Sequence, residues 1–306
     1  MNQKPNLNYA SQFAILLGLL GLALIVSSFI MGLFATLVLN TPLSQAGTAL
    51  LEPQNANLGR LLNTVTTFIA FFLPAWAVAR IIHKNPFSQL GFNRVISPKQ
   101  VSLVVLITLG ALFLGGALGT LNELIPMPAS FLKKARALEE AYKTTMLAMA
   151  TMHSFTDYVL SLVVIALAPA IFEEVLFRGS MQTIFIGWTR NPWTGIIITS
   201  ILFSAIHGSY FGFLPRFGLG IILGLVYSIS KNIWLNITMH FLNNAIVVSQ
   251  IYLLTRMGKP VKAAMDESMP VWLGVIALVL LYYVFTLFRK ESEHVLFNQQ
   301  PITGNE

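Results

Sequence analysis

The chain has 306 residues, of which 55% are hydrophobic and only 10% carry a charged side chain. Soluble domains contain about 25% charged residues, so this composition, with a mean hydropathy of +0.71, excludes an ordinary cytosolic protein and a disordered chain. The formal net charge is +7, but the basic residues are scattered singly or in pairs, without the basic arm of a nucleic-acid-binding protein. No cysteine is present, which removes disulfides, thiolate metal sites and a cysteine nucleophile. We expect a multi-pass integral membrane protein of a bacterial cell membrane, with the lipid bilayer as its partner and no nucleic acid.

Apolar runs of membrane-spanning length predict eight transmembrane helices. A hydrocarbon core of roughly 30 Å needs about 20 apolar residues per helix, and charges or turn residues bound each run. The fifth and sixth runs are short. The fold class is therefore all-α, a polytopic helical bundle that forms one integral membrane domain over residues 1–306. The predicted spans are Phe13–Leu39, Leu61–Ile82, Val101–Leu121, Tyr158–Ile186, Trp193–His207, Phe217–Ser230, Ile233–Leu254 and Val271–Phe288.

The segment from Pro126 to Asp157 differs from the rest because charged residues alternate with Leu, Ala and Met. The helical spacing of its apolar positions predicts an amphipathic helix on the membrane interface, either a lid or a long connector. Glycines in the third and sixth spans, in contrast, are interpreted as positions where helices approach closely. The charged residues are Lys133, Lys134, Arg136, Glu139, Glu140 and Lys143, and the glycines are Gly110, Gly115, Gly116, Gly119, Gly220 and Gly224.

Of the 12 carboxylates, only Glu173 and Glu174 lie inside an apolar run. A charge at the centre of a span costs roughly 2.5–3.5 kcal/mol on insertion scales, so such residues usually serve a function or a tight pair. Glu174 and Arg178 are four residues apart on one helix face and can neutralise each other. Glu173 is rotated about 100° from Glu174, so it needs its own partner or a proton and is the better candidate for chemistry. The structural alternative is a single buried ion-pair cluster of all three residues.

Two histidines also fall within predicted spans. Phe203 precedes His207 by four residues and so shares its helix face, and His240 shares a face with Asn244 and Asn236. An interhelical hydrogen bond is the common role of a single histidine in a bilayer, but two histidines together with an unpaired acid need a further explanation.

Distances along the helices predict that these groups converge. Glu173 and His207 each lie about fourteen or fifteen residues from the turn at residues 187–192, or roughly 21–23 Å, on the two arms of one hairpin. Measured from the turn at Lys231, His240 lies roughly 12 Å deep and Asn244 roughly 18 Å deep. We therefore expect one carboxylate, two imidazoles and an amide to meet within a turn of one another, nearer the face opposite those turns.

A carboxylate beside an imidazole can hold and deprotonate a water molecule. An imidazole and an amide can stabilise the oxyanion that forms when this water attacks an amide carbonyl, so Glu173, His207, His240 and Asn244 predict peptide-bond hydrolysis within the membrane. No histidine is followed by glutamate, and no Gly-x-Ser-x-Gly is present, which removes the H-E-x-x-H zinc helix and the serine nucleophile elbow. The nucleophile must then be water.

Three motifs in chain order carry a resemblance to a known family: E-E-x-x-x-R at Glu173, F-x-x-x-H at Phe203 and H-x-x-x-N at His240. Together they resemble the CAAX-processing and bacteriocin-processing (CPBP, or Abi) intramembrane peptidases, which include the Ras-converting prenyl-protein peptidases. The resemblance covers about residues 158–250, with a catalytic core at about 158–254. It implies an eight-helix bundle of the glutamic type in which Glu173 and His207 activate water, His240 and Asn244 form the oxyanion hole, and Glu174, Arg178 and Phe203 support the site. A peptide or membrane-protein substrate follows, either CAAX-like or a bacteriocin or signal peptide.

Three alternatives stay open from the sequence. Glu173, His207 and His240 are conceivable ligands of a divalent metal such as zinc, although they come from separate helices, and we favour a mechanism that requires no cofactor. A proton-coupled transporter would use the same buried ionisable groups as a relay, but transporters often show internal repeats and none is found here. A non-catalytic immunity or scaffold protein that binds a peptide is the third reading.

Overall fold

The computed structural model describes residues 7–93, 95–150, 152–259 and 269–298, and regular secondary structure in this part of the chain is helical throughout. Seven helical rods among these residues are long and apolar enough to cross a membrane, which confirms the polytopic all-α bundle. Single helices form five of the rods: α1 (Tyr9–Leu39), α6 (Pro98–Glu123), α12 (Phe213–Ser230), α13 (Ile233–Arg256) and α15 (Val271–Phe297). Two rods are composite. The first joins η1 (Pro53–Asn55), α3 (Ala56–Thr67), η2 (Phe68–Phe72) and α4 (Leu73–Ile82), and the second joins α8 (Phe155–Ser161), η3 (Leu162–Leu167), α9 (Ala168–Glu174), η4 (Val175–Gln182) and α10 (Thr183–Thr189).

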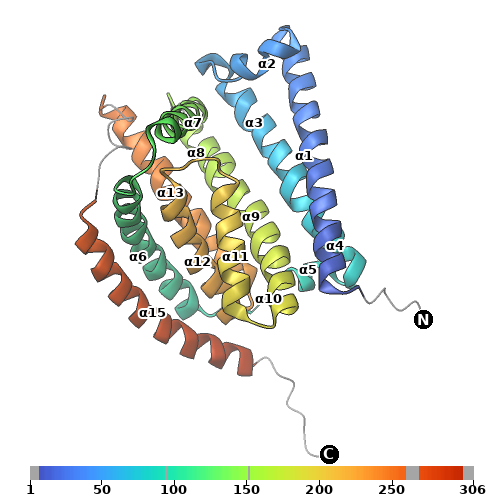
Figure 1. Ribbon diagram of the computed structural model, residues 1–306, viewed down its shortest axis with the longest axis vertical. Coiled ribbons are helices and arrows are strands. Elements are labelled where there is room, and N and C mark those ends of the chain that lie inside the picture. The colour runs from blue at the N-terminus through green and yellow to red at the C-terminus, as the bar shows by residue number, and fades with distance from the viewer. Residues whose placement is uncertain (1–6, 94, 151, 260–268, 299–306) are drawn as a thin grey trace, which may run out of the picture.

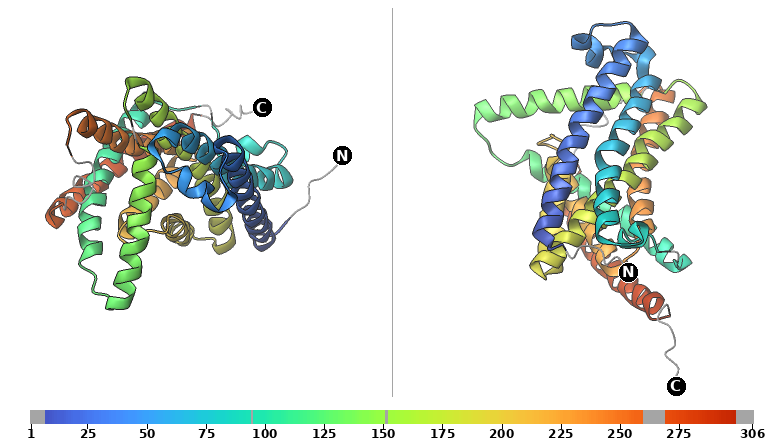
Figure 2. Two further views of the ribbon diagram at one scale, coloured as in Figure 1. Left: turned by 90° about the horizontal axis from the view of Figure 1, so that it is seen from above. Right: turned by 90° about the vertical axis from the view of Figure 1, so that its right-hand side faces the viewer.

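The helices α1, α3 and α4 lie on one side of the bundle and α6 and α15 on the other, with α9 to α12 between them (Figure 1). The amphipathic segment forms α7 (Ala129–Met149), which lies across the long helices (Figure 2, right view, light green). Two short helices, α2 (Leu43–Ala49) and α5 (Pro86–Gln89), lie in connections. The position of α7 matches the interfacial helix that the sequence predicts, and it brings this helix to one end of the bundle.

The fifth predicted span, Trp193–His207, is shorter in the structure than the sequence suggests. Its helix, α11 (Pro192–Ala205), has 14 residues and measures about 21 Å at 1.5 Å per residue, less than the roughly 30 Å hydrocarbon core. The chain turns after the helix, at Gly208, whose φ is +64°. His207 therefore lies in the connection between α11 and α12 and not on a helix.

The two turns from which the depths were measured are both present, and local chemistry explains each of them. Arg190 and Lys231 end their helices with φ of 54°, in the left-handed region. The next residue caps the following helix: the side chain of Asn191 accepts from the backbone N–H groups of Trp193 and Thr194, and the side chain of Asn232 accepts from the backbone N–H of Trp234 in α13. These caps fix where α11 and α13 begin, and so set how far along each helix the site residues lie.

Three π-helical segments interrupt the two composite rods. Pro74 follows η2 and Pro169 follows η3, and because proline has no N–H and crowds the preceding turn, the helix widens before each one. The third segment, η4, begins directly after Glu174 and packs closely on the chain near α5. A Cβ added at Gly179 would lie 2.9 Å from the carbonyl oxygen of Leu90, so glycine is required for this approach. The depths predicted from the sequence assume the regular rise of an α-helix, and the widened turns are a finding of the structure.

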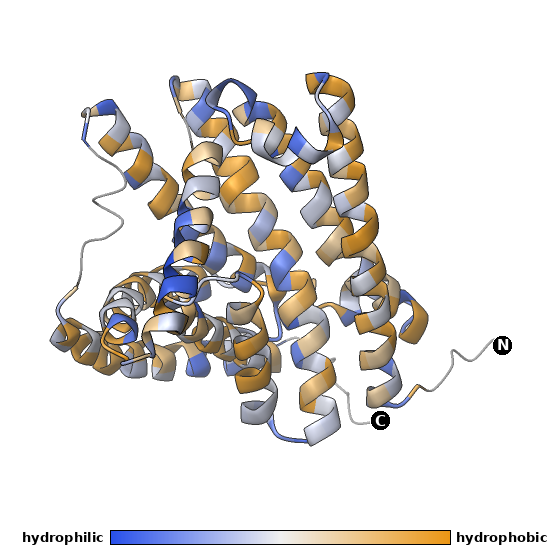
Figure 3. Ribbon diagram, turned by 45° about the horizontal axis from the view of Figure 1, so that its top comes forward, coloured by the Kyte–Doolittle hydropathy of each residue, from blue (hydrophilic) through white to orange (hydrophobic). Residues whose placement is uncertain are grey.

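Side chains are buried between the helices, while the outer faces of the bundle stay apolar. One buried cluster includes Leu16 of α1 and Phe177 of η4, and a second includes Ile107 of α6 and Phe288 of α15. In contrast, Ile25 of α1 is 71% exposed. Figure 3 shows hydrophobic colouring along the length of α1. This exposed apolar surface is what a helix facing lipid presents.

Gly220→Ala is expected to lower the free energy of unfolding by about 1–3 kcal/mol. A Cβ at position 220 would lie 2.9 Å from the Cβ and 3.1 Å from the Cα of Ser200, so α11 and α12 would have to separate. Gly115 provides the matched control because nothing lies within 4 Å of a Cβ built there, and its interpretation as a packing position is therefore wrong. Unfolding in mixed detergent micelles measures both variants, and equal effects would contradict the packing argument.

Candidate active site

The four groups to which the sequence assigns chemistry line a single cavity of about 440 Å³. Glu173 comes from α9, His207 from the connection after α11, and His240 and Asn244 from α13. Side chains of α3 and α7 complete the walls. Segments that are distant in the sequence thus meet as the depth argument predicts, at the end of the bundle where α7 lies (Figure 1).

Glu174 does not line this cavity but lies behind it, with no exposed surface. Its Oε1 accepts hydrogen bonds from Nη1 of Arg178, at 3.1 Å, and from Nδ1 of His240, at 2.8 Å. Its Oε2 accepts from Nδ2 of Asn236, at 3.3 Å. The pairing with Arg178 one turn away is as predicted. The sequence did not reveal that the same carboxylate also holds two side chains of α13.

Arg178 extends this network to the neighbouring helices. Its Nη2 donates to the carbonyl oxygen of Gly220 in α12, at 3.2 Å. Its guanidinium carbon lies 4.7 Å from the ring centroid of Phe203, within the range of a cation–π contact. The Phe203 ring in turn meets the rings of His207 and His240 edge-on, at centroid distances of 5.2 and 5.9 Å. Phe203 therefore separates the buried ion pair from the cavity and fixes the orientation of both imidazoles.

Glu173 is not part of the ion pair, so the alternative of one cluster containing all three charged residues applies only to Glu174 and Arg178. Oε2 of Glu173 is buried and has no hydrogen-bond partner among the described residues. The nearest titratable nitrogen is Nε2 of His240, at 3.9 Å, which is beyond a direct hydrogen bond. A buried carboxylate oxygen without a partner is costly, and it is suited to receive a hydrogen bond from water or substrate.

The hydrogen bonds of the two imidazoles determine what each ring presents to the cavity. Nδ1 of His207 lies 2.7 Å from the carbonyl oxygen of Phe203, which can only accept, so Nδ1 carries the proton and Nε2 of a neutral ring is an acceptor. Nδ1 of His240 donates to Glu174 in the same way. His240 can therefore donate from Nε2 only when its ring is doubly protonated.

Asn244 lines the cavity one turn beyond His240. Its Oδ1 accepts from Nδ2 of the neighbouring Asn243, at 3.2 Å. The amide NH₂ group of Asn244 is therefore left to donate to another acceptor. Such a donor, fixed through its own carbonyl oxygen, is the kind of group that stabilises an oxyanion.

The structure places further residues on the cavity walls that sequence reasoning missed. Arg216 and Tyr142 face each other there, with the guanidinium carbon 4.7 Å from the ring centroid. Asn63 and Thr67 of α3 also line the cavity. Pro215 could have indicated that Arg216 lies in a helix. Proline is well tolerated in the first turn of a helix, so Pro215 favours a helix that begins before Phe217.

No group of three or more His, Asp or Glu side chains within the described ranges is arranged to hold a metal ion. Glu173, His207 and His240, the residues considered as zinc ligands from the sequence, therefore do not form such a group.

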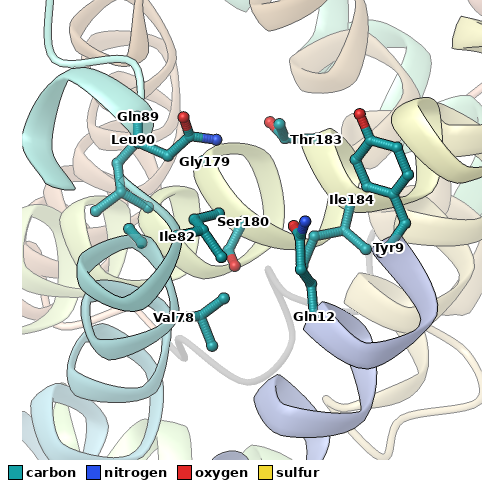
Figure 4. Close-up of a pocket in the computed structure, with 11 residues that line it drawn as sticks. Tyr9, Gln12, Val78, Ile82, Gln89, Leu90, Gly179, Ser180, Thr183 and Ile184 are labelled. Carbon is teal, nitrogen blue, oxygen red and sulfur yellow. The ribbon is translucent and has the colours of Figure 1, made fainter. Parts of the chain in front are cut away.

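A second, smaller cavity of about 220 Å³ lies among α1, α4, α5, η4 and α10 (Figure 4). Its polar side chains, which include Gln12 and Ser180, are neutral. The only titratable group among the residues that line it is a tyrosine hydroxyl, so this cavity offers positions for control substitutions.

Residues 155–246 match the family described as "Type II CAAX prenyl endopeptidase Rce1-like". Through this segment the chain is similar to the CAAX-processing (CPBP) family of membrane proteases. The matched residues include the whole predicted site, from Glu173 to Asn244. The family match thus agrees with the resemblance carried by the three motifs.

Two curated bacterial relatives are each similar to little more than a quarter of the chain. An uncharacterised 24.3 kDa protein of Escherichia coli is 37% identical over 81 residues, which are 26% of this chain and 36% of the relative. The uncharacterised protein YpbD of Bacillus subtilis (strain 168) is 31% identical over 94 residues, 29% of this chain and 45% of the relative. The chain thus spans less than half the length of either relative. No solved structure matches the chain.

Proposed function

We propose that the chain is an intramembrane endopeptidase that hydrolyses a peptide bond with an activated water molecule, and that residues 158–254 form its catalytic core. The observation that carries this proposal is that Glu173, whose Oε2 has no hydrogen-bond partner among the described residues, lines one cavity together with His207, His240 and Asn244. A buried ion pair that only joined helices would not need an unpaired acid and two oriented imidazoles facing an open space. The family match supports the same class of reaction.

In the first step, water donates hydrogen bonds to the carboxylate of Glu173 and to Nε2 of His207. Glu173 takes one proton from this water, and the oxygen attacks the carbonyl carbon of the peptide bond. The electron pair of the C=O double bond moves to the carbonyl oxygen, which becomes the oxyanion of a tetrahedral intermediate. The amide NH₂ of Asn244 donates to this oxyanion, and Nε2 of His240 joins it when the ring is doubly protonated.

In the second step, the C=O double bond re-forms and the C–N bond breaks. The proton held by Glu173 passes to the leaving nitrogen, so the products are a carboxylic acid and an amine, and Glu173 returns to its starting form. Glu174 acts behind the site. Its hydrogen bond to Nδ1 of His240 fixes the orientation of that ring, and Arg178 balances its charge. Glu173 carries the one proton that is transferred in this cycle, and the second proton of the water stays on the carboxylic acid product. The proposed reaction therefore requires no cofactor.

The proposed substrate is a C-terminal peptide of a membrane-bound protein, as the CAAX-type family suggests. The cavity walls contain apolar side chains that suit the apolar residues of such a peptide, among them Met146, Met149, Val247 and Ile251. Release of a fragment from a farnesylated fluorogenic peptide by the purified protein in liposomes tests the proposal. Solute uptake without cleavage would instead indicate a transporter, and binding without either an immunity or scaffold protein.

Asn244→Ala is expected to lower kcat by about 10²-fold with little change in KM, because the lost donor acts mainly on the charge of the transition state. Steady-state cleavage of the same peptide measures both constants. Gln12→Ala, in the second cavity, is the matched control and is expected to cleave at the wild-type rate. A rise in KM with unchanged kcat in the Asn244 variant would assign this residue to substrate binding instead.

A further inference from the structure

Arg216 is a charged residue of the cavity that the proposed reaction does not use. It lies in the first turn of α12 and lines the same cavity as Glu173 and His207. Its Nη1 is buried and has no hydrogen-bond partner among the described residues. It is also the only lysine or arginine among the described residues that line this cavity. A guanidinium with a buried donor that is not used is costly unless a ligand supplies the acceptor.

The surroundings of Arg216 hold its guanidinium in place. The Tyr142 ring of α7 covers one side, with the guanidinium carbon 4.7 Å from the ring centroid. The backbone at Gly212 lies so close that an added Cβ would overlap the guanidinium group. Packing therefore fixes the position of the cation without neutralising it. Such a group matches a carboxylate, which guanidinium binds through parallel hydrogen bonds.

We propose that Arg216 binds the free C-terminal carboxylate of the peptide substrate and so directs cleavage to chain ends. This inference rests on the proposed function. A cavity of about 440 Å³ has the size of a pocket for a small ligand, so it holds a few residues of a peptide. A chain that ends inside the cavity carries its terminal charge with it, and that charge needs a cation. Arg216 supplies it, while the carboxylate of Glu173 stays free for water.

Three farnesylated fluorogenic peptides test this assignment: one with a free C-terminal carboxylate, one with a C-terminal amide, and one with aspartate as an amidated last residue. The wild-type protein is expected to cleave the free acid with a kcat/KM about tenfold to a hundredfold above that of the plain amide. Arg216→Gln is expected to bring this ratio near one by slowing the acid alone. Arg216→Lys keeps the charge but loses the parallel hydrogen bonds, so it should retain part of the ratio. Arg136→Gln, an exposed change on α7, should keep the wild-type ratio.

Each other outcome counts against a particular claim. Equal cleavage of the acid and the plain amide by the wild-type protein overturns the Arg216 assignment and leaves the proposed function standing. Preference for the aspartate peptide over the free acid shows that the site binds an acidic side chain, which also overturns the assignment. Cleavage of no peptide overturns the proposed function, and binding of the acid and the amide to the Glu173→Gln protein then decides the Arg216 assignment alone. Tighter binding of the acid supports it, and equal binding rejects it.

Discussion

Glu173→Gln is expected to lower kcat for peptide cleavage by about 10³-fold, the middle to upper part of the range for loss of a general base. Glutamine keeps the size of the side chain and can still hold a water molecule, but it cannot take the proton. Because Oε2 of Glu173 has no hydrogen-bond partner among the described residues, the substitution should leave the free energy of unfolding within about 1 kcal/mol of wild type. Cleavage in liposomes and unfolding in mixed micelles measure the two effects.

A second substitution tests whether His207 activates the water together with Glu173. His207→Ala removes the acceptor Nε2 and should also abolish detectable cleavage, while the helices remain folded because His207 lies outside α11. Cleavage at the wild-type rate by both variants would show that neither residue activates the water. Ser180→Ala in the second cavity controls for a general effect of substitution within the bundle.

Glu174→Gln, one position along the chain, should lose stability as well as cleavage, unlike Glu173→Gln. This change leaves the buried guanidinium of Arg178 without its counter-charge and weakens the hold on His240. Removal of one partner of a buried ion pair typically costs about 3–5 kcal/mol. We therefore expect a decrease of that size in the free energy of unfolding, together with loss of cleavage. Glu173→Gln is its matched control, since it makes the same chemical change at the adjacent residue.

The double substitution Glu174→Gln, Arg178→Met separates stability from activity. Removing both charges takes away the uncompensated guanidinium, so much of the lost stability should return. Cleavage should stay absent, because His240 still lacks the carboxylate that orients it. A double variant as unstable as Glu174→Gln alone would mean that the charge of Arg178 is not the source of the loss, and a stable, active Glu174→Gln protein would contradict the role of this carboxylate altogether.

The sequence predicted the parts of the fold and site that depend on spacing within one helix. Hydropathy located the long spans, and a spacing of four residues predicted the pairing of Glu174 with Arg178. Contacts between helices are harder to predict from the sequence, because they depend on the rotation of each helix about its axis. The hydrogen bond from His240 to Glu174 is of this kind, and nothing in the local sequence indicates it.

The remaining differences between the predicted spans and the structure arise where a helix begins or ends at another residue, or where an α-helix widens into a π-helix. The sixth predicted span begins at Phe217, whereas α12 begins at Phe213, so Arg216 was counted as a loop residue although it lies in the cavity wall. The α11 helix ends before His207 because the chain turns at Gly208. The π-helical segment after Glu174 contains no proline from which it could be predicted. The roles assigned to the site residues stay predictions, to be decided by the substitutions described above.

The hydrogen bonds around Glu174 determine when the candidate site can assemble during synthesis. The acid belongs to α9, but its partners other than Arg178 belong to α13, and Arg178 itself is anchored on α12. A nascent chain enters the membrane from its N-terminus, so Glu174 arrives well before the side chains that will surround it. Until residue 240 has been translated, the chain has neither a complete pocket nor an oriented His240. The candidate site is therefore assembled only when insertion of the chain is nearly complete.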